Sequence, residues 1–346
     1  MKTEHKIIFG NSNNMKDIWD ESVDLMITSP PYPMIKMWDE MFGEQNPEIT
    51  HALKEEDGEK AFELMHQELD KVWDETFRVL RNGGIACINI GDSTRTLKDV
   101  FQIYTNHARI LRSCLGLGFH ALPEILWIKE TNKPDKFMGS GMLPVGAYVT
   151  LEHEHILILR KDGKRKFTKQ EQKENRQKSA FFWEERNMWF SDKWKDINGV
   201  FQKLNNNKLR ERSGAYPIEL AYRLINMFSV QGDVVLDPFL GTGTTTLGAM
   251  ASGRNSMGVE IDKNFNDIIE LRINEIKKIV DARVQGRIVN HKEFVKKREE
   301  EKGKLKYYNK NYGFPIMTRQ EINLHIPRIK EVKKIRENLF EVEHLF

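Results

Sequence analysis

Short apolar runs alternate along the chain with longer stretches whose apolar residues recur every three or four positions. The short runs predict strands, because strands buried on both faces carry nearly continuous apolar side chains. The longer stretches predict helices that each bury one stripe. Strands alternating with helices predict an α/β protein with a mainly parallel sheet. The predicted strands are Lys6–Phe9, Val23–Thr28, Ile85–Ile90, Glu124–Ile128, His155–Arg160, Val234–Leu236 and Met257–Ile261.

Three helices are clearly marked in the same pattern. The first covers Ala61–Leu80 and stops before an Asn-Gly-Gly sequence, and the second begins at Pro217, a residue that suits a first helical turn. The third begins near Phe265 and leads into a tail rich in Lys, Arg and Glu, which we expect to be a charged helical extension. The expected division is a first half (1–161), an inserted segment (162–200), a second half (201–275) and the extension (276–346).

Composition and charge set limits on the class of protein. The chain has 346 residues, 39% of them hydrophobic, and a net charge of +3, values typical of soluble globular proteins. It contains no apolar run near the roughly 18 residues of a membrane span and no signal-peptide stretch, so we expect a cytoplasmic location and no membrane partner. Cys87 and Cys114 have neither disulfide-framework nor zinc spacing. Positive charge is concentrated in residues 160–210, with 15 Lys and Arg against 7 Asp and Glu.

The sequence TSPPY (Thr28–Tyr32) directly follows one predicted strand. Two consecutive prolines cannot continue a sheet ladder, so the chain must leave the strand at its carboxyl end, where open α/β sheets bind ligands. The Ser29 hydroxyl, the Pro30 carbonyl and the Tyr32 ring then form two acceptors and an aromatic plate. A planar group with an exocyclic amine fits this set. A plain strand-ending turn also fits the motif on its own.

A second motif spans Val234–Asp262. A strand ends at Asp237, a turn with Gly241 and Gly243 and then a helix follow, and a further strand ends with Glu260. Free N–H groups at the helix start suit a carboxylate or phosphate, and the acidic side chain at the end of the next strand suits ribose hydroxyls. This order of elements predicts an adenosine-containing cofactor.

Two departures from known fingerprints narrow the cofactor. The dinucleotide fingerprint requires a third glycine where this chain has Thr246, and the phosphate loop of nucleotide triphosphatases requires a lysine that is absent between Gly241 and Gly253. An adenosine ligand with an anionic end but no pyrophosphate remains. S-adenosylmethionine is the natural candidate.

The motif TSPPY, together with DPFLGTGTT (Asp237–Thr245) and AYP (Ala215–Pro217), resembles the amino-methyltransferases of DNA. Their permuted β-group order places the catalytic motif before the cofactor motif, and the resemblance covers about residues 5–275. It implies a Rossmann-like, circularly permuted sheet of seven mostly parallel strands with an inserted target-recognition segment. It also implies S-adenosylmethionine as cofactor and double-stranded DNA as partner. A separately encoded restriction endonuclease and a homodimer are further implied partners, although the oligomeric state stays open.

The resemblance assigns roles to individual residues. The catalytic group is Ser29, Pro30, Pro31 and Tyr32. Tyr216 and Pro217 stand where the family often has Phe-Pro beside the methionine part of the cofactor, and Asn11 stands where many members have an aspartate near the adenine ring. The expected cofactor pocket comprises Asn11, Tyr216, Pro217, Asp237, Pro238, Phe239, Gly241, Gly243, Thr244, Thr245 and Glu260.

The acceptor motif also predicts a mechanism. An exocyclic amine is a poor nucleophile because its lone pair is conjugated with the ring, and acceptors on its N–H groups favour the electron-rich, pyramidal form. Tyr32 would stack on the flipped base and tolerate the positive charge that develops during direct methyl transfer. Methylation at carbon 5 of cytosine requires a Pro-Cys nucleophile, which this chain lacks because Cys87 follows Ala86 and Cys114 follows Ser113.

The methylated atom depends on the first residue of the motif. In the family a serine is typical of cytosine-N4 enzymes and an aspartate of adenine-N6 enzymes, so Ser29 favours cytosine N4. Adenine N6 is the alternative with the same mechanism. Methylation of RNA or of a protein glutamine fits less well, because those families use Asn-Pro-Pro-Tyr and place the cofactor motif first. A non-enzymatic nucleotide-binding or DNA-binding protein with a dead site is the remaining alternative.

The basic inserted segment is where we expect DNA contacts, from Lys164, Arg165, Lys166, Trp183 and Trp189. A solvated loop over a small satellite core explains the same residues equally well. His153 and His155 alternate on a predicted strand and so share a face, but no further ligand stands at a recognisable spacing, and we expect no metal site.

Overall fold

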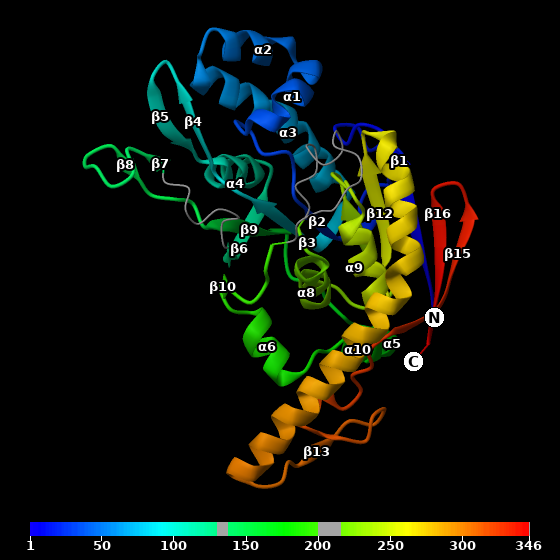
Figure 1. Ribbon diagram of the computed structural model, residues 1–346. Helices are drawn as coiled ribbons and strands as arrows, with labels where there is room; N and C mark the ends of the chain where they lie inside the picture. The colour runs from blue at the N-terminus through cyan, green and yellow to red at the C-terminus, as the bar shows by residue number, and fades with distance from the viewer. Residues whose placement is uncertain (130–137, 200–215, 346) are drawn as a thin grey trace.

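The computed structural model describes residues 1–129, 138–199 and 216–345. A ten-stranded sheet runs through these residues, with helices on both faces (Figure 1). The expected α/β fold is confirmed, and all seven predicted strands belong to the sheet. The strand order is β10 (Lys193–Trp194), β6 (Phe119–Ile128), β9 (His153–Lys161), β3 (Leu80–Ile90), β2 (Val23–Thr28), β11 (Val234–Asp237), β12 (Asn255–Glu260), β1 (Lys2–Phe9), β16 (Leu339–Leu345) and β15 (Arg328–Arg336).

Strand direction gives the sheet two distinct edges. The five central strands β3, β2, β11, β12 and β1 run parallel. Strand β9 runs antiparallel between β3 and β6, and β16 runs antiparallel to β1. The edge where the parallel strands end is called the carboxyl edge here, and the edge where they begin is the amino edge. Strand β9 therefore delivers the chain to the amino edge.

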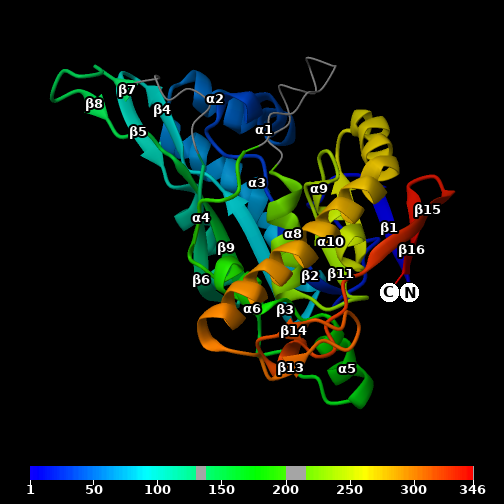
Figure 2. The same cartoon turned by 60° about the horizontal axis from the view of Figure 1, so that its bottom comes forward.

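Helices cover both faces of the sheet and explain why its central strands are apolar throughout. On one face lie α3 (Gly58–Val79) and α4 (Asn106–Gly116), and on the other α8 (Ile218–Phe228), α9 (Thr244–Ser252) and α10 (Asn266–Lys302) (Figures 1 and 2). Trp73 of α3 packs in one core with Ile88 of β3, whereas the neighbouring Cys87 packs in another core with Leu224 of α8. Every residue of β2 is buried between these layers.

Shorter elements surround this framework. None of the described helices is both long and apolar enough to span a membrane. Three short 3-10 turns cover Lys36–Trp38, Lys263–Phe265 and Arg319–Glu321. The remaining helices and strands are α1 (Asp39–Gln45), α2 (Pro47–Lys54), α5 (Gln170–Lys178), α6 (Trp183–Trp189), β4 (Ser93–Leu97), β5 (Val100–Tyr104), β7 (Met138–Gly139), β8 (Ala147–Tyr148), β13 (Tyr307–Tyr308) and β14 (Pro315–Ile316).

The carboxyl-terminal extension corrects one expectation. The helical extension predicted over 276–346 is wrong beyond Lys302, where α10 ends, because the chain then forms loops and the hairpin β15–β16. Burial alternates along β16, where Phe340, Val342 and His344 are buried and Glu341 and Glu343 lie between them. Burial that alternates with a period of two is typical of a strand, even when the exposed positions are charged. The hairpin extends the sheet beyond β1, with which β16 pairs, and brings the two termini together, as Figure 1 shows.

Candidate active site

A cavity of about 880 Å³ opens at the carboxyl edge, where β2, β11 and β12 end. All four expected catalytic residues line it: Ser29, Pro30, Pro31 and Tyr32. Although 209 residues separate Thr28 from Asp237, both motifs face this one cavity. The expected cofactor residues that line it are Asn11, Tyr216, Asp237, Pro238, Phe239, Gly241, Thr244 and Glu260. Ala215, the first residue of the AYP motif, lies outside the described residues.

Asp237 ties the two motifs together. Its Oδ1 accepts hydrogen bonds from Thr28 Oγ1 at 2.7 Å and from the Phe239 N–H at 3.0 Å. Its Oδ2 accepts from Thr245 Oγ1 at 2.5 Å and from the Tyr216 hydroxyl at 3.3 Å. Burial raises the pKa of this carboxyl above its ordinary value, and the four donors oppose that shift. Asp237 is therefore a joint between the strand before Ser29 and the glycine turn, and its oxygens are already engaged.

The glycine turn takes its shape from positive backbone angles. Gly241 has φ +52° and Gly243 has φ +82°, a region that favours glycine. A Cβ on Gly243 would also lie 3.3 Å from a methyl group of Ile269 in α10. Gly243, Thr245 and Pro217 do not line the cavity, so these three expected cofactor residues shape the turn and the starts of α9 and α8 instead.

Glu260 ends β12 at the rim of the cavity. Its Oε2 accepts from the Gly241 N–H at 2.7 Å, and its Oε1 accepts from the Asp262 N–H at 2.9 Å. Burial raises the pKa of this carboxyl. A carboxylate offers about four acceptor positions, so lone pairs remain for two hydroxyl groups in the cavity. Asn11 lies beside it, because the preceding Gly10 N–H donates to the Glu260 carbonyl at 2.9 Å.

A hydrogen-bonded group that sequence reasoning missed lies behind the catalytic motif. The Tyr32 hydroxyl lies 3.1 Å from Ser29 Oγ and donates to Glu154 Oε2 at 3.0 Å. Asn89 Nδ2 donates to the same Oε2 at 2.7 Å, and Lys129 Nζ donates to Oε1 at 2.7 Å. Burial and the adjacent Glu154 raise the pKa of Tyr32 well above 10, so the phenol stays protonated. Asn89, Lys129 and Glu154 are called the Glu154 group below.

The charge of the cavity suits a cationic ligand. Trp127 of β6 forms part of its wall and donates through Nε1 to the Ile197 carbonyl at 2.8 Å. Among the described lining residues Lys129 is the only basic one, and it pairs with Glu154. A sulfonium ion would therefore meet a predominantly negative surface. The acidic lining residues are Glu40, Glu44, Glu68, Glu154, Asp237, Glu260 and Asp262.

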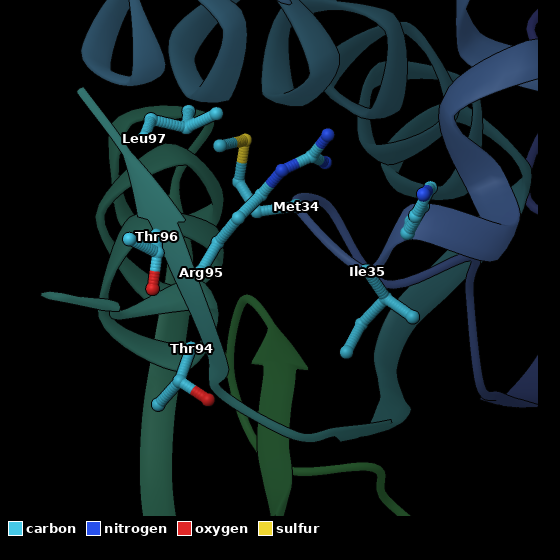
Figure 3. A pocket seen from close by; sticks show the side chains of 7 residues that line it. Met34, Ile35, Thr94, Arg95, Thr96 and Leu97 are labelled. Atoms are coloured by element: carbon cyan, nitrogen blue, oxygen red, sulfur yellow. The ribbon is translucent and has the colours of Figure 1, made fainter. Parts of the chain in front are cut away.

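A smaller hollow of about 340 Å³ lies behind the motif, between residues 34–36 and strand β4 (Figure 3). The Arg95 side chain extends past Met34 toward the helices, as Figure 3 shows. There its guanidinium donates to both carboxylate oxygens of Asp39 at 2.8 Å. This hollow belongs to the packing of the segment after Tyr32, and its arginine is already bound.

The first part of the inserted segment, around Arg165, lies at the opposite edge of the sheet from the cavity, whereas Gly199 near its other end lines the cavity. Arg165 Nη1 lies 3.0 Å from Asp24 at the start of β2 and 2.6 Å from Asp233, directly before β11. Both carboxylates are buried. Lys164 and Lys166 flank this arginine and are exposed at the same amino edge. The guanidinium of Arg165 thus neutralises two buried acids, a structural role that does not require the expected DNA contact.

The two tryptophans that we expect to contact DNA differ in their exposure to solvent. Trp189 is 4% exposed and packs in a core with Tyr222 of α8 and Ile276 of α10, so the expectation that it contacts DNA is wrong. Trp183 is 40% exposed and stacks on Phe294 of α10, with the ring centroids 5.6 Å apart. Trp189 therefore belongs to a satellite core, the structural alternative that the sequence also allowed, whereas Trp183 remains accessible.

The paired histidines also have a structural explanation. The His155 ring stacks on His107, with centroids 3.9 Å apart and an interplanar angle of 9°. His107 Nδ1 lies 2.8 Å from Asp92, and this hydrogen bond raises the pKa of His107. A metal ion must lie in the plane of each imidazole that binds it, and two parallel rings at this spacing share no such point. The three side chains suit a stacked, charge-assisted pair.

Sequence comparison finds a family and two close relatives. The model of the N6/N4 DNA methylase family matches residues 23–271. The Type II methyltransferase M.MthZI from Methanothermobacter thermautotrophicus is 53% identical over 342 residues, which cover 99% of this chain and 95% of the relative. The Type II methyltransferase M.MjaI from Methanocaldococcus jannaschii is 50% identical over 282 residues, 78% of this chain and 91% of the relative.

Two solved structures resemble the fold. A proposed DNA modification methylase from Thermus thermophilus, in complex with S-adenosyl-L-methionine, matches with a TM-score of 0.61 and 32% identity over 79% of this chain and 95% of that chain. The cytosine-N4-specific PvuII DNA methyltransferase matches with a TM-score of 0.51 over 81% of this chain and 92% of that chain. At 16% identity, the second match concerns the fold alone.

Proposed function

Because the chain belongs to the N6/N4 family of DNA methylases, we propose that it methylates the exocyclic N4 amine of a cytosine flipped out of double-stranded DNA. Family membership makes it a DNA methyltransferase whose cofactor is S-adenosylmethionine. The proposal adds the methylated atom, the flipped base and the residues that act on them.

The single observation that carries the proposal is the joint at Asp237. Thr28, directly before Ser29, donates to this carboxylate, which in turn holds the glycine turn through the Phe239 N–H. The amine acceptors and the adenosine-binding turn are thereby fixed relative to each other in one cavity. Direct methyl transfer requires mainly this kind of positioning.

The cavity residues have distinct tasks in the reaction. The cofactor supplies an electrophilic methyl group on a sulfonium ion. The Ser29 hydroxyl and the Pro30 carbonyl accept the two N–H groups of the amine, and the Tyr32 ring stacks on the base and stabilises its developing positive charge. The lone pairs that Glu260 keeps free suit the ribose hydroxyls, and the acidic lining favours the cationic ligand.

Cytosine N4 is favoured over adenine N6 by Ser29. In the family that the sequence resembles, serine at this position is typical of cytosine-N4 enzymes, although the chemistry of an acceptor admits either amine. Carbon-5 methylation has no nucleophile here: Cys87 and Cys114 are buried, do not line the cavity, and have thiol pKa values raised by burial.

The order of the motifs supports the permuted β-group arrangement, because the acceptor motif precedes the glycine turn. The Type II designation of the two relatives supports a place in a restriction-modification system. In such a system the methylated site is protected from a separately encoded endonuclease. Homodimer formation belongs to the same proposal, and sedimentation of the purified protein tests it.

A transfer assay tests the proposed substrate. Tritiated S-adenosylmethionine is offered with unmethylated genomic DNA, tRNA or a protein release factor, and labelled DNA is digested to nucleosides for mass spectrometry. The expected product is N4-methylcytosine, and Ser29→Ala and Tyr32→Ala should abolish most of it. Tyr308→Ala is a matched control, since Tyr308 is 53% exposed and far along the chain from either motif. N6-methyladenine would contradict the choice of base, and label on tRNA or protein would contradict DNA as substrate.

A further inference from the structure

We propose that Glu154 is a positioning residue: it fixes the direction of the hydrogen-bond chain through Tyr32, so that Ser29 Oγ turns its lone pairs toward the target amine. The inference rests on the proposed function and deepens it, because it explains how a hydroxyl, which can donate or accept, becomes an acceptor. It applies to any exocyclic amine in the cavity.

The chain consists of three oxygens in sequence. Ser29 Oγ lies 3.1 Å from the Tyr32 hydroxyl oxygen, which lies 3.0 Å from Glu154 Oε2. A phenol has one proton to donate. If that proton lies on the bond to Glu154, only the serine hydroxyl can donate across the 3.1 Å contact between Ser29 and Tyr32, whose oxygen also accepts from Asn89 Nδ2 at 3.0 Å. Ser29 then donates toward Tyr32, and the lone pair that does not face Asn89 Nδ2, 3.5 Å away, is left for another donor.

The surroundings of Glu154 fix it as the acceptor end. Lys129 Nζ donates to Oε1 and Asn89 Nδ2 donates to Oε2, both at 2.7 Å. An ammonium can only donate, and the amide donates through this nitrogen, so both hold the carboxylate in place as an acceptor. The Glu154 side chain is 13% exposed, which limits competition from solvent. Strand pairing sets this geometry, because β6 and β9 place Trp127 opposite Glu154.

Reversal of the chain would disable the motif. If position 154 donated to Tyr32, the tyrosine proton would turn to Ser29 and the serine proton would point into the cavity. Two N–H or O–H donors would then face each other where the amine must bind, and the amine would lose one of its two acceptors. Glutamine at position 154 has nearly the volume of glutamate and carries an N–H group that can donate to Tyr32. It is therefore the substitution that can reverse the chain without changing the packing.

Glu154→Gln is therefore the decisive variant. We expect the single-turnover methylation rate to fall about tenfold to 100-fold, the size of one hydrogen bond to a charged group. The KM for DNA should change less than about threefold, since shape and charge outside the cavity are preserved. Glu152→Gln is the matched control, because Glu152 is exposed and two residues away on the same segment, and it should keep the wild-type rate.

Two second-site variants separate positioning from simple packing. In Tyr32→Phe the chain is already broken, so adding Glu154→Gln should cost little more than Tyr32→Phe alone. In Ser29→Asp the acceptor is a carboxylate that needs no orientation, so Glu154→Gln should lower the rate less than about threefold relative to Ser29→Asp itself. Thermal unfolding of each variant identifies any that fails to fold.

The inference would be overturned if the rate losses of Tyr32→Phe and Glu154→Gln were additive in the double variant. A Glu154→Gln variant with the wild-type rate would also overturn it. These outcomes are separate from failure of the proposed function. A wild-type protein that methylates no DNA would overturn both, whereas an active wild type with additive variants would overturn the inference alone. Active wild type with a strongly non-additive pair at Tyr32 and Glu154 supports it.

Discussion

The two edges of the central sheet hold charged residues of similar kind and use them in opposite ways. At the amino edge Arg165 neutralises Asp24 and Asp233, so that charge is internally compensated. At the carboxyl edge the described residues that line the cavity include many acids and one lysine, and Glu260 keeps acceptor positions for a ligand. The position of a charge relative to the strand ends therefore predicts its role better than the charge density of a segment does.

The largest loss of stability should come from removing the arginine that pairs with Asp24 and Asp233 at the amino edge. Arg165→Met removes the ion-pair partner of the buried Asp233 and leaves the buried Asp24 with Arg81 alone, whose Nη1 lies 2.8 Å away; loss of one partner of a buried pair typically costs about 3 kcal/mol. Urea unfolding should show this loss of stability, and Lys169→Met, on an exposed neighbour, should show almost none. An Arg165→Met protein of full stability but weak DNA affinity would instead place the arginine on DNA.

The joint at the carboxyl edge should respond more modestly. Thr28→Val keeps the volume of the side chain but removes a hydrogen bond to the buried Asp237 carboxylate, so the free energy of unfolding should fall by about 2 kcal/mol. Because the acceptor motif and the glycine turn are then less firmly joined, cofactor affinity measured by calorimetry should also decrease. Unchanged affinity with reduced stability would show that the joint serves folding alone.

The amino edge should also be visible in the pH dependence of stability. Burial and the Asp233 carboxylate raise the pKa of Asp24 to about 6, above the value of about 3.9 expected in the unfolded chain. Between these values the folded state holds more protons, so the stability from Asp24 is present below about pH 4 and is lost as the pH rises through 6.

Asp24→Asn cannot titrate, so its stability relative to wild type should rise between pH 4 and 6. The expected slope is at most about 1.4 kcal/mol per pH unit. Chemical unfolding at several pH values measures it. Parallel profiles for the two proteins would show that Asp24 titrates normally in the fold.

The smallest effect should come from the exposed lysines of the same edge. Each phosphate contact contributes about 0.9 to the slope of log affinity against log salt concentration. If Lys164 and Lys166 stay away from DNA, the double variant Lys164→Ala/Lys166→Ala should keep the wild-type slope. A slope reduced by nearly two units would show that both lysines contact DNA phosphates, and therefore that DNA binds at the amino edge.

Local sequence was sufficient for much of the fold and for both motifs. Val23–Thr28 form a strand with the predicted bounds, because an apolar run followed by two prolines has one way to continue. The glycine turn before α9 was equally visible, since positive φ angles demand glycine. In β16 the period of two was present, but its interspersed charges were interpreted as a helix face.

The Glu154 group shows why the rest of the site could not be predicted. Asn89 and Glu154 meet Tyr32, and Lys129 meets Glu154, only because strands from distant parts of the chain lie side by side. His153 and His155 share one face of β9, whereas Glu154 between them points to the opposite face, so the histidine pattern gives no signal for it. The register of β6 against β9 brings Lys129 near Glu154, and no local sequence pattern specifies that register.

The most direct test of the account is a crystal structure of the protein with S-adenosylhomocysteine and a DNA duplex that contains its target. We expect a cytosine flipped into the cavity, with its N4 within hydrogen-bond distance of Ser29 Oγ and of the Pro30 carbonyl oxygen and its face on Tyr32. An adenine in that position would contradict the choice of base. Bound DNA along the amino edge, with an empty cavity, would contradict the assignment of the two edges.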